Sequence, residues 1–476
     1  MTATDKTTLK SYFNTNDIPT ETQFADFIDT IGILTLGVAA SNASDSSKGR
    51  ADYICDGVND EVQIQAAIDA LPASGGKIVF SEGTFICAKG GARAIDPVMN
   101  YCMTIDQTDG KLWLDGMGRA TIFKLADGQD ANTPIVLVQG LTADKRLSST
   151  LITGIEFDGN ETGQVASWVD FGLVTAIYSD EVTLDRCYLH SSPHQSFHFL
   201  RNCLYCRITN NRVESNSVHT GAATEVPNII IAGNDFRDDL AVTTGSLISL
   251  VANADIGVVS EKCSVQNNIF TGGFVQLTLS GAKHCTVFGN LFRDVTDLNS
   301  VALKLEFFNS IIADYNCLEN MICANVFENI RDGIYVTGDA SNGSLRNHIV
   351  NNQIIEGAGV GLSYGILQSG AASLANYYAG NRIVGANLPI SIAAGTAIVE
   401  HNIGYVTESY GATSVADGGT ISHGLAATPT VVIVTTSVAD EYAAVTALAA
   451  TNFTVALTKH DGSAGTTQTI YWRAYI

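Results

Sequence analysis

A short phrase recurs ten times between Ile152 and Asn402 and constrains the fold more than any other feature of the chain. Each copy has an apolar residue, two free positions, usually an asparagine, one free position and a second apolar residue, as in residues 208–213 and 287–292. Neighbouring copies are 21 to 35 residues apart. The central positions of the ten copies are Ile155, Cys187, Asn211, Asn234, Asn268, Asn290, Asn325, Asn352, Asn381 and Asn402.

A period of this length is typical of a solenoid, and the period-two alternation inside each copy predicts strands. We therefore expect a parallel β-helix in which the short spacings are bare coils and the longer ones carry an inserted loop. We also expect each asparagine to occupy a left-handed turn conformation and to bond the asparagines above and below it. The alternative is an antiparallel sandwich, although the Asn-Gly pairs that mark hairpins are almost absent from the repeat.

Composition excludes several classes of protein. The 476 residues include 26 basic and 48 acidic ones, so a nucleic-acid partner, which needs clustered cations, is not expected. The ten cysteines show no zinc-binding spacing, and we expect free thiols in the core, with no metal and no cofactor. No apolar run reaches the roughly 18 residues of a membrane span, and the polar start does not resemble a signal peptide. We expect a protein that folds in a cytoplasm and does not insert into a membrane.

The amino-terminal end differs from the repeat. Residues 1–49 predict a small helical unit over 5–34, for attachment or oligomerisation, and a linker of small residues over 36–48. Thr20 and Gln23 have the spacing of a capping box at the start of a helix. An isolated helical unit of this size buries little apolar surface, so we expect it to pack on another chain.

The segments that flank the repeat predict a cap and a second domain. Residues 50–110 contain an amphipathic helix, with Val62 on its apolar face and Asp60 as its cap, which we expect to cover the open end of the solenoid. The solenoid is expected over 111–405. Alternating strands in residues 406–476 predict a small β-sandwich.

Several segments resemble a known family. The glycine turn and strand at 75–80, followed by the Glu-Gly-Thr-Phe of 82–85, look like the first segment of pectate-lyase-like right-handed parallel β-helix proteins, particularly bacteriophage tailspikes and related depolymerases. Residues 112–118 and 152–159 are similar to their first coils, and 12–24 resembles the amino-terminal unit of some phage tail proteins.

This resemblance implies a homotrimer in the virion tail that attaches to the phage tail or baseplate through its amino terminus and binds a bacterial surface polysaccharide. The scaffold also hosts hydrolases, lyases, epimerases and inert adhesins, so the fold alone does not name the reaction. The leading hypothesis is therefore a tailspike-like depolymerase that acts outside the cell by hydrolysis or β-elimination. The alternatives are a non-enzymatic receptor-binding fibre or adhesin, and a free polysaccharide lyase or epimerase.

One candidate site comes from residues predicted to face outward on successive coils. Glu306 shares an exposed strand face with Lys304, and Tyr335 follows on the next coil; Gln276 and Thr278 are expected to face outward on the preceding one. Asp332 begins the next strand, in an Asp-Gly-Ile sequence that resembles the catalytic aspartate position of polygalacturonase-like β-helices, although the other motifs of that family are missing. Asp294 lies in the turn before the strand of Glu306.

Two carboxyl groups suit glycoside hydrolysis, one as acid and one as base or nucleophile. We therefore take Glu306, Asp332 and Asp294 as candidate catalytic residues, and Lys304 and Tyr335 as candidate substrate-binding residues. A solvated acidic face is the alternative interpretation.

Two further candidates lie earlier in the chain. His194, His198 and Arg186 could support β-elimination on a uronic acid, or the histidines could simply be hydrogen-bonded. Trp168 sits in a polar loop between Asp158 and Asp170, which suits an aromatic platform for a sugar ring beside hydroxyl-binding acids, although packing on a neighbouring coil explains the tryptophan equally well.

Overall fold

The structure, a computed structural model, describes Thr20, Gln23 and most of the chain from Leu34 onward. The described ranges beyond those two residues are 34–93, 99–106, 109–129, 133–142, 146–164, 172–201, 203–215, 221–224, 226–238, 245–252, 259–295, 297, 300–308, 315–356 and 361–476. The rest of the predicted amino-terminal helical unit lies outside them. Thr20 and Gln23 do form the predicted capping box, because the backbone N–H of each donates to the side-chain oxygen of the other, at 3.0 and 3.2 Å.

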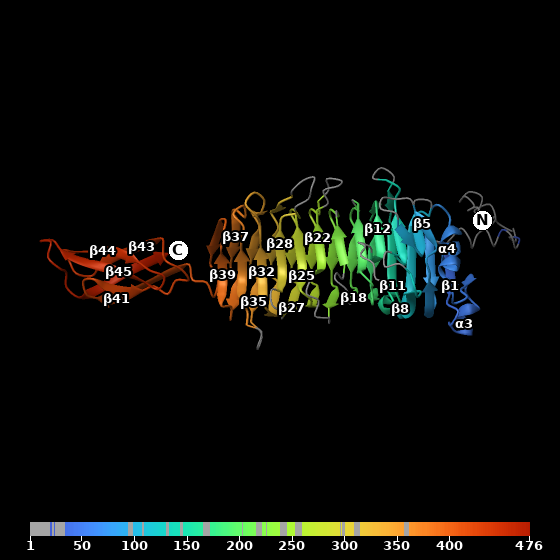
Figure 1. Ribbon diagram of the computed structural model, residues 1–476, viewed down its shortest axis with the longest axis horizontal. Helices are drawn as coiled ribbons and strands as arrows, with labels where there is room; N and C mark the ends of the chain where they lie inside the picture. The colour runs from blue at the N-terminus through green and yellow to red at the C-terminus, as the bar shows by residue number, and fades with distance from the viewer. Residues whose placement is uncertain are drawn as a thin grey trace, which may run out of the picture.

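The repeat forms a parallel β-helix whose strands stack along the long axis of the molecule (Figure 1). Among the described residues, one sheet has 23 strands and a second has 11, and the pairings within both are parallel. A typical coil runs through β23 (Ser264–Gln266) and β24 (Ile269–Gly272) in the first sheet and β25 (Val275–Ser280) in the second. The predicted fold class, all-β with a right-handed parallel β-helix, is confirmed, and the antiparallel alternative for the repeat is wrong.

The eight central asparagines form a continuous ladder of buried amides. In each rung the side-chain oxygen accepts from both the backbone N–H and the side-chain amide of the asparagine one coil earlier; Asn290 accepts from Asn268 at 2.9 and 3.0 Å. The amide of Asn290 also donates to the carbonyl of Val265, at 2.9 Å. The ladder therefore satisfies the polar groups of a corner that water does not reach.

The ladder asparagines do not have the left-handed backbone that we expected. The residue directly before each one has positive φ instead, as Asn267 (54°) and Gly289 (65°) do before Asn268 and Asn290. The left-handed residue makes the corner, and this turn directs the side chain of the following asparagine into the core. Asparagine suits both positions, and the pair Asn267-Asn268 shows one of each.

A second ladder, which the sequence analysis missed, occupies another corner of the last coils. Asn320, Asn347 and Asn376 are buried five residues before the main ladder positions, and the side chain of each accepts from the residue one coil earlier. The backbone N–H of Cys285 donates to Asn320 at 2.8 Å, so the cysteine continues this column in the earlier coils. All ten cysteines are free and nine are buried, as predicted for small core residues.

Phenylalanines that follow the ladder stack inside the solenoid. Phe236, Phe270, Phe292 and Phe327 lie two residues after their asparagines, with neighbouring ring centroids 4.7 to 5.1 Å apart. The planes of the last three rings are within 8° of parallel. Ring stacking and amide bonding thus fix the same coil-to-coil register.

The predicted covering helix is present as α4 (Glu61–Asp69), at the blue end of the solenoid (Figure 1). Its Gln65 side chain accepts from the backbone N–H of Thr104 at 2.9 Å and donates to the carbonyl of Thr104 at 3.1 Å. Thr104 belongs to β7 (Met103–Asp106), the edge strand of the 11-stranded sheet, so the helix satisfies backbone groups that an open edge would expose.

Two details of this helix differ from expectation. Val62 is exposed, because it lies about 200° around the helix from the buried Ile64. The buried side chain of Asp60 does not cap the helix; its two oxygens accept from the backbone N–H groups of Gly57 and Ile86, at 2.6 and 2.7 Å.

The stretch 36–48, expected to be a linker, is part of the first coil. β1 (Thr35–Ala39) pairs in parallel with β2 (Tyr53–Ile54) and β3 (Gly76–Phe80), and α3 (Asp45–Lys48) follows it. The small Val38 and Ala39 at the end of β1, and Ala40 after them, are buried in the core of the coil. Parallel stacking therefore begins before residue 111.

The predicted carboxy-terminal β-sandwich is confirmed as two antiparallel sheets of three strands beyond the solenoid (Figure 1). The first sheet consists of β41 (Glu408–Val415), β46 (Gln468–Tyr475) and β43 (Val431–Thr436). The second consists of β42 (Gly419–Ser422), β45 (Asn452–Lys459) and β44 (Glu441–Leu448). Phe453 and Trp472 pack edge to face at 5.6 Å between the sheets, in a core separate from that of the solenoid.

We predict that Asn290→Ala lowers the free energy of unfolding by about 2–4 kcal/mol, because two buried N–H groups of Asn268 lose their acceptor. The matched control is Asn267→Gly, at the exposed left-handed position next to the ladder, which should cost less than about 1 kcal/mol. Guanidinium unfolding followed by circular dichroism measures both. Equal losses for the two variants would contradict the structural role of the ladder.

Candidate functional site

Three of the candidate residues come together on the outer face of the 11-stranded sheet. Strand alternation buries Leu305 in the core, so Lys304 and Glu306 of β28 (Val301–Glu306) point outward. Tyr335 of β32 (Asp332–Val336) pairs directly with Lys304 in the next coil, so their side chains are about 4.8 Å apart along the axis. The expected outward direction of these three side chains is confirmed.

These residues belong to a connected polar group, which we call the polar strip: Lys304, Glu306, Tyr335, Thr337 and Ser369. The ammonium of Lys304 lies 2.5 Å from a carboxylate oxygen of Glu306, and both side chains are about one quarter to one third exposed, at 30% and 26%. The hydroxyl groups of Tyr335 and Ser369 are 2.9 Å apart, and Ser369 donates to Thr337 at 3.4 Å. The strip thus offers a cation, a carboxylate and hydroxyls over neighbouring coils.

The 11-stranded sheet, which carries the polar strip, differs from the 23-stranded sheet in being bordered by long loops. The extra residues of long coils lie between the asparagine corner and the strands of the 11-stranded sheet, as in the 34 residues between Asn234 and Asn268, which include β22 (Ser246–Val251). Insertions therefore border the outer face of this sheet and leave the asparagine corner unchanged.

Not every side chain expected on this face is exposed. Gln276 is fully buried, and its amide donates to the carbonyls of Gly272 and Arg293, at 3.0 and 2.7 Å. The exposed position predicted for it is wrong, because its side chain satisfies backbone carbonyls of two strands of the 23-stranded sheet. Thr278 is also buried, with its hydroxyl 2.7 Å from that of Ser246.

Asp332 is not close to Glu306. It pairs with Val301 at the beginning of β28, whereas Glu306 ends that strand five residues later. At about 3.3 Å per residue the two carboxyl groups are separated by roughly 16 Å along the strand. Glycosidases hold their carboxyl pair about 5 to 9.5 Å apart, so the structure does not form the predicted catalytic pair.

Asp332 has an unusual environment of its own. Burial raises the pKa of its carboxyl, while the backbone N–H of Tyr364 and the charge of Arg331 partly lower it. Its Oδ1 is buried and accepts no hydrogen bond from any described residue.

Asp294 is also apart from Glu306. It lies in β27 (Leu291–Val295) with a φ of 60°, and its Oδ1 accepts from the side chain of Asn329 at 2.6 Å. This contact links neighbouring coils at a corner, and Asp294 does not reach the polar strip.

The histidine and arginine candidates point to different sides of the coil. His198 lies in β16 (Gln195–Leu200), in the same outward column as Lys304, although it is buried. His194 is buried in the turn before β16. Arg186 has positive φ at the asparagine corner and donates to Asp185 at 2.9 Å, so the structure does not bring it to the histidines.

The tryptophan loop is only partly described. Trp168 and Asp170 lie outside the described residues. Asp158 ends β11 (Thr150–Asp158) in the 23-stranded sheet and pairs with Lys124 at 3.2 Å. Asp158 is therefore on a different sheet from the polar strip.

A second polar cluster, which the sequence analysis missed, lies on the outer face of the 23-stranded sheet. Tyr188 stacks on His190 at 4.6 Å, lies 4.2 Å beneath the guanidinium of Arg119, and donates to Glu214 at 2.6 Å. His190 and Arg119 both contact Glu156, at 3.2 Å. Strand alternation through the central positions would have revealed this cluster.

Burial, followed by the bond to Glu214, raises the pKa of Tyr188 to about 12. Tyr188 therefore stays protonated at neutral pH. The polar groups of this cluster occupy one another, which suits a network that stabilises the coils better than a substrate site.

Neither a metal site nor a membrane-spanning helix is found in the described part of the chain. No group of three or more His, Cys, Asp or Glu side chains there is arranged to hold a metal ion. No helix among those residues has the length and apolar character needed to cross a membrane.

Solved structures with similar folds include an epimerase module and phage tailspikes. No protein family and no curated protein matches the sequence. The A-module of the mannuronan C-5 epimerase AlgE4 of Azotobacter vinelandii aligns with a TM-score of 0.53 and 15% identity, over 76% of this chain and 100% of the module. The chain shares its parallel β-helix fold with this module.

Phage tailspikes align equally well. A mutant tailspike of Escherichia coli bacteriophage HK620, in complex with a pentasaccharide, has a TM-score of 0.53 and 14% identity over 72% of this chain, which spans 62% of that tailspike. Tailspike gp49 of Pseudomonas phage LKA1 has a TM-score of 0.51 and 12% identity, over 87% of this chain and 92% of gp49. At these identities the likeness shows the fold.

We predict that Asp332→Asn stabilises the protein at pH 7. Because burial raises the pKa of Asp332, the folded chain holds this proton more tightly than the unfolded chain does. The resulting stabilisation is complete below the unfolded pKa of about 3.9 and is lost as the pH rises through the folded pKa. Denaturant midpoints should therefore favour the variant at pH 7 and converge below about pH 3.9. A variant less stable than the native protein at pH 7 would show that the charge of Asp332 is needed.

Proposed function

We propose that this protein is a tailspike-like protein that binds a bacterial surface polysaccharide along the outer face of the 11-stranded sheet and cleaves it at the polar strip. The main support for this proposal is the cluster of Lys304, Glu306 and Tyr335 on adjacent coils. A half-buried ion pair on a sheet surface contributes little to stability, so a ligand is the better explanation for its presence. Similar folds in a mannuronan C-5 epimerase and in a tailspike with bound pentasaccharide support the substrate class.

The composition of the strip favours β-elimination over hydrolysis. In elimination a base removes the proton beside a uronate carboxylate, the C–O bond to the next sugar breaks, and the leaving oxygen takes up a proton. Lys304 would neutralise the carboxylate as negative charge develops, and Glu306 would hold Lys304 in place. The hydroxyl of Tyr335 would give its proton to the leaving oxygen while its oxygen accepts the proton from the sugar carbon, so that the residue ends the step protonated as it began. Hydrolysis by a carboxyl pair has less support, since Asp332 and Asp294 are both distant from Glu306.

The quaternary and cellular parts of the proposal are a homotrimer in the virion tail, attached to the phage tail or baseplate by the amino-terminal unit. The outer face of the 23-stranded sheet carries exposed apolar side chains that a neighbouring solenoid would cover: Ile269, Phe288 and Met321. Tailspikes among the similar folds support the assignment to a phage tail.

We predict that Lys304→Ala, Glu306→Gln and Tyr335→Phe each reduce polysaccharide cleavage by about a hundredfold or more. The assay exposes the protein to a panel of capsular and lipopolysaccharide glycans and measures reducing ends together with the ultraviolet absorbance of unsaturated uronate. Elimination produces both signals, whereas hydrolysis produces reducing ends alone.

The matched control is Glu319→Gln, which removes an exposed ion pair with Arg346 (2.7 Å) at a corner of the solenoid. It should cleave as the native protein does. Native activity in all three strip variants would place the reaction elsewhere. Saturable binding without cleavage by the native protein would identify a receptor-binding fibre instead.

The trimer is tested separately by light scattering at micromolar concentration. We predict three times the chain mass for the native protein and a smaller mass for Phe288→Glu, because the new charge would be buried between copies. A monomeric native protein would remove the assembly part of the proposal.

A further inference from the structure

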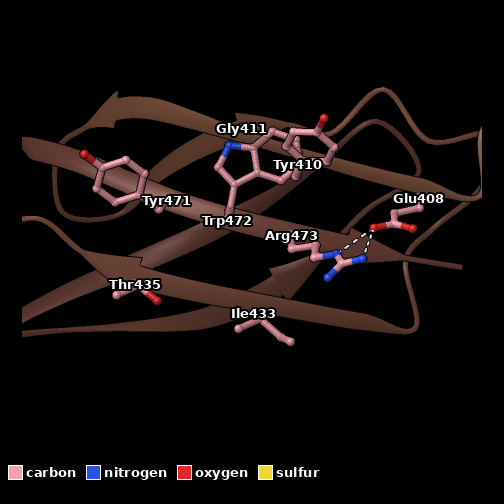
Figure 2. Close-up of a pocket in the computed structure, with 8 residues that line it drawn as sticks. All are labelled: Glu408, Tyr410, Gly411, Ile433, Thr435, Tyr471, Trp472 and Arg473. Atoms are coloured by element: carbon pink, nitrogen blue, oxygen red, sulfur yellow. Dashed lines mark hydrogen bonds and ion pairs between the residues drawn. The ribbon is translucent and has the colours of Figure 1, made fainter.

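The carboxy-terminal sandwich has a hollow on the outer face of its first sheet, far along the chain from the polar strip (Figure 2). Its volume is about 530 Å³, within the range of about 300 to 1,000 Å³ typical of small-ligand sites. The lining residues are Glu408, Tyr410, Gly411, Ile433, Thr435, Tyr471, Trp472 and Arg473.

Two tyrosines on this face have exposed side chains. Tyr410 is 78% exposed and Tyr471 is 55% exposed. In the antiparallel pairing of β41 with β46, Tyr410 lies opposite Arg473 and Tyr471 lies opposite Ala412. The tyrosines are therefore diagonal neighbours with Cα atoms about 7–8 Å apart, and the small Ala412 leaves the space beside Tyr471 open.

The floor of the hollow is rigid. A Cβ atom on Gly411 would lie 2.9 Å from Cζ2 of Trp472, so the glycine lets the indole pack flat against β41. The indole N–H donates to Thr413 at 3.1 Å, and the ring packs edge to face on Phe453. The tyrosines thus rise from a sheet that an aromatic ring holds in place.

One side of the hollow is polar and carries no net charge. The guanidinium of Arg473 donates to the carboxylate of Glu408 at 2.6 Å, and Figure 2 shows the pair beside Ile433 and Tyr410. The bond to Glu408 raises the pKa of Arg473. The paired charges leave free donor and acceptor positions for hydroxyl groups while offering little attraction to an anion.

We propose that this hollow is a second carbohydrate-binding site, which takes neutral pyranose units by stacking them on Tyr410 and Tyr471 and bonding their hydroxyls to Arg473, Glu408 and Thr435. Sugar rings have apolar CH faces and polar edges, and this surface alternates aromatic faces with paired polar groups in the same way. The inference takes its ligand class from the proposed function and adds a non-catalytic contact.

The alternative occupant is a second copy of the chain. Contacts between copies place mainly apolar side chains at the centre of the interface and leave charges at the rim. Here the ion pair and Thr435 lie in the hollow with the tyrosines. A saccharide therefore fits the mixture better.

The test titrates the full-length protein with maltoheptaose, cellohexaose and mannohexaose, and with hexagalacturonate as the charged comparison, using isothermal calorimetry. We expect at least one neutral oligosaccharide to bind, and Tyr410→Ala and Tyr471→Ala each to weaken it about tenfold or more. Tyr410→Phe keeps the ring and should retain most of the affinity. The matched control is Tyr442→Ala, which removes a tyrosine of similar exposure (59%) from the other sheet, and it should bind as the native protein does.

Three results would overturn the inference: no neutral oligosaccharide binds, the Tyr410 and Tyr471 variants bind normally, or these variants change only the mass of the assembly. Lys304→Ala separates the two proposals, because it should abolish cleavage and leave binding in the sandwich unchanged. Neutral-sugar binding that depends on Tyr410, in a protein without cleavage activity, would refute the proposed reaction and support this site.

Discussion

The structure depends on amide side chains that bond across successive coils. From Asn234 onward, each ladder asparagine accepts twice through its side-chain oxygen and donates twice through its side-chain amide, as Asn290 does with Asn268, Asn325 and Val265. None of these partners can be replaced by water at a corner with at most 7% exposure. A coil that displaced its asparagine would leave unpaired groups in two neighbours, so every coil keeps the same cross-section at that corner.

This constraint decides where the chain can vary. The asparagine corner and the phenylalanine stack behind it fix two sides of each coil, so insertions are confined to the ends of the strands of the 11-stranded sheet. Outward side chains on that sheet are also free to differ, because they take no part in the ladder. The same coil therefore combines a rigid frame with one variable face, and a ligand that runs along the axis would meet a different residue at every 4.8 Å or so.

The sequence predicted the features that repeat. The period and the asparagine positions gave the parallel β-helix, and alternation correctly turned Lys304, Glu306 and Tyr335 outward. It failed where the answer depended on one end of a strand. Alternation tells which face a side chain occupies but not how far along the strand its neighbours lie. The sequence therefore predicts Asp332 beside Glu306, whereas Asp332 lies opposite the first residue of β28 and Glu306 is the last.

Local turns account for the other errors. A left-handed residue such as Ser191, with φ of 50°, redirects the chain between His190 and His194. Three histidines spaced by four residues therefore reach three different surroundings: His190 contacts Glu156 on the 23-stranded sheet, whereas His198 belongs to the 11-stranded sheet. Each of these turns needs one residue with positive φ. Asparagine, glycine, serine and alanine all adopt positive φ in this chain, so the residue type alone does not predict where the turns lie.

The stability of the fold explains the asparagine ladder, but it does not explain the ion pair of Lys304 and Glu306 on the variable face. In its column, Lys304 lies between Thr278 and Tyr335, and neither neighbour requires a cation beside it. The ion pair of Lys304 and Glu306 restricts the motion of two long side chains, and a partly exposed pair of this kind contributes at most about 1 kcal/mol to the stability of the fold. Replacement by neutral residues would leave the coil intact, since the inward Leu303 and Leu305 carry the packing. The ion pair is thus a feature that the fold tolerates and does not need, which is the physical ground for placing the ligand there.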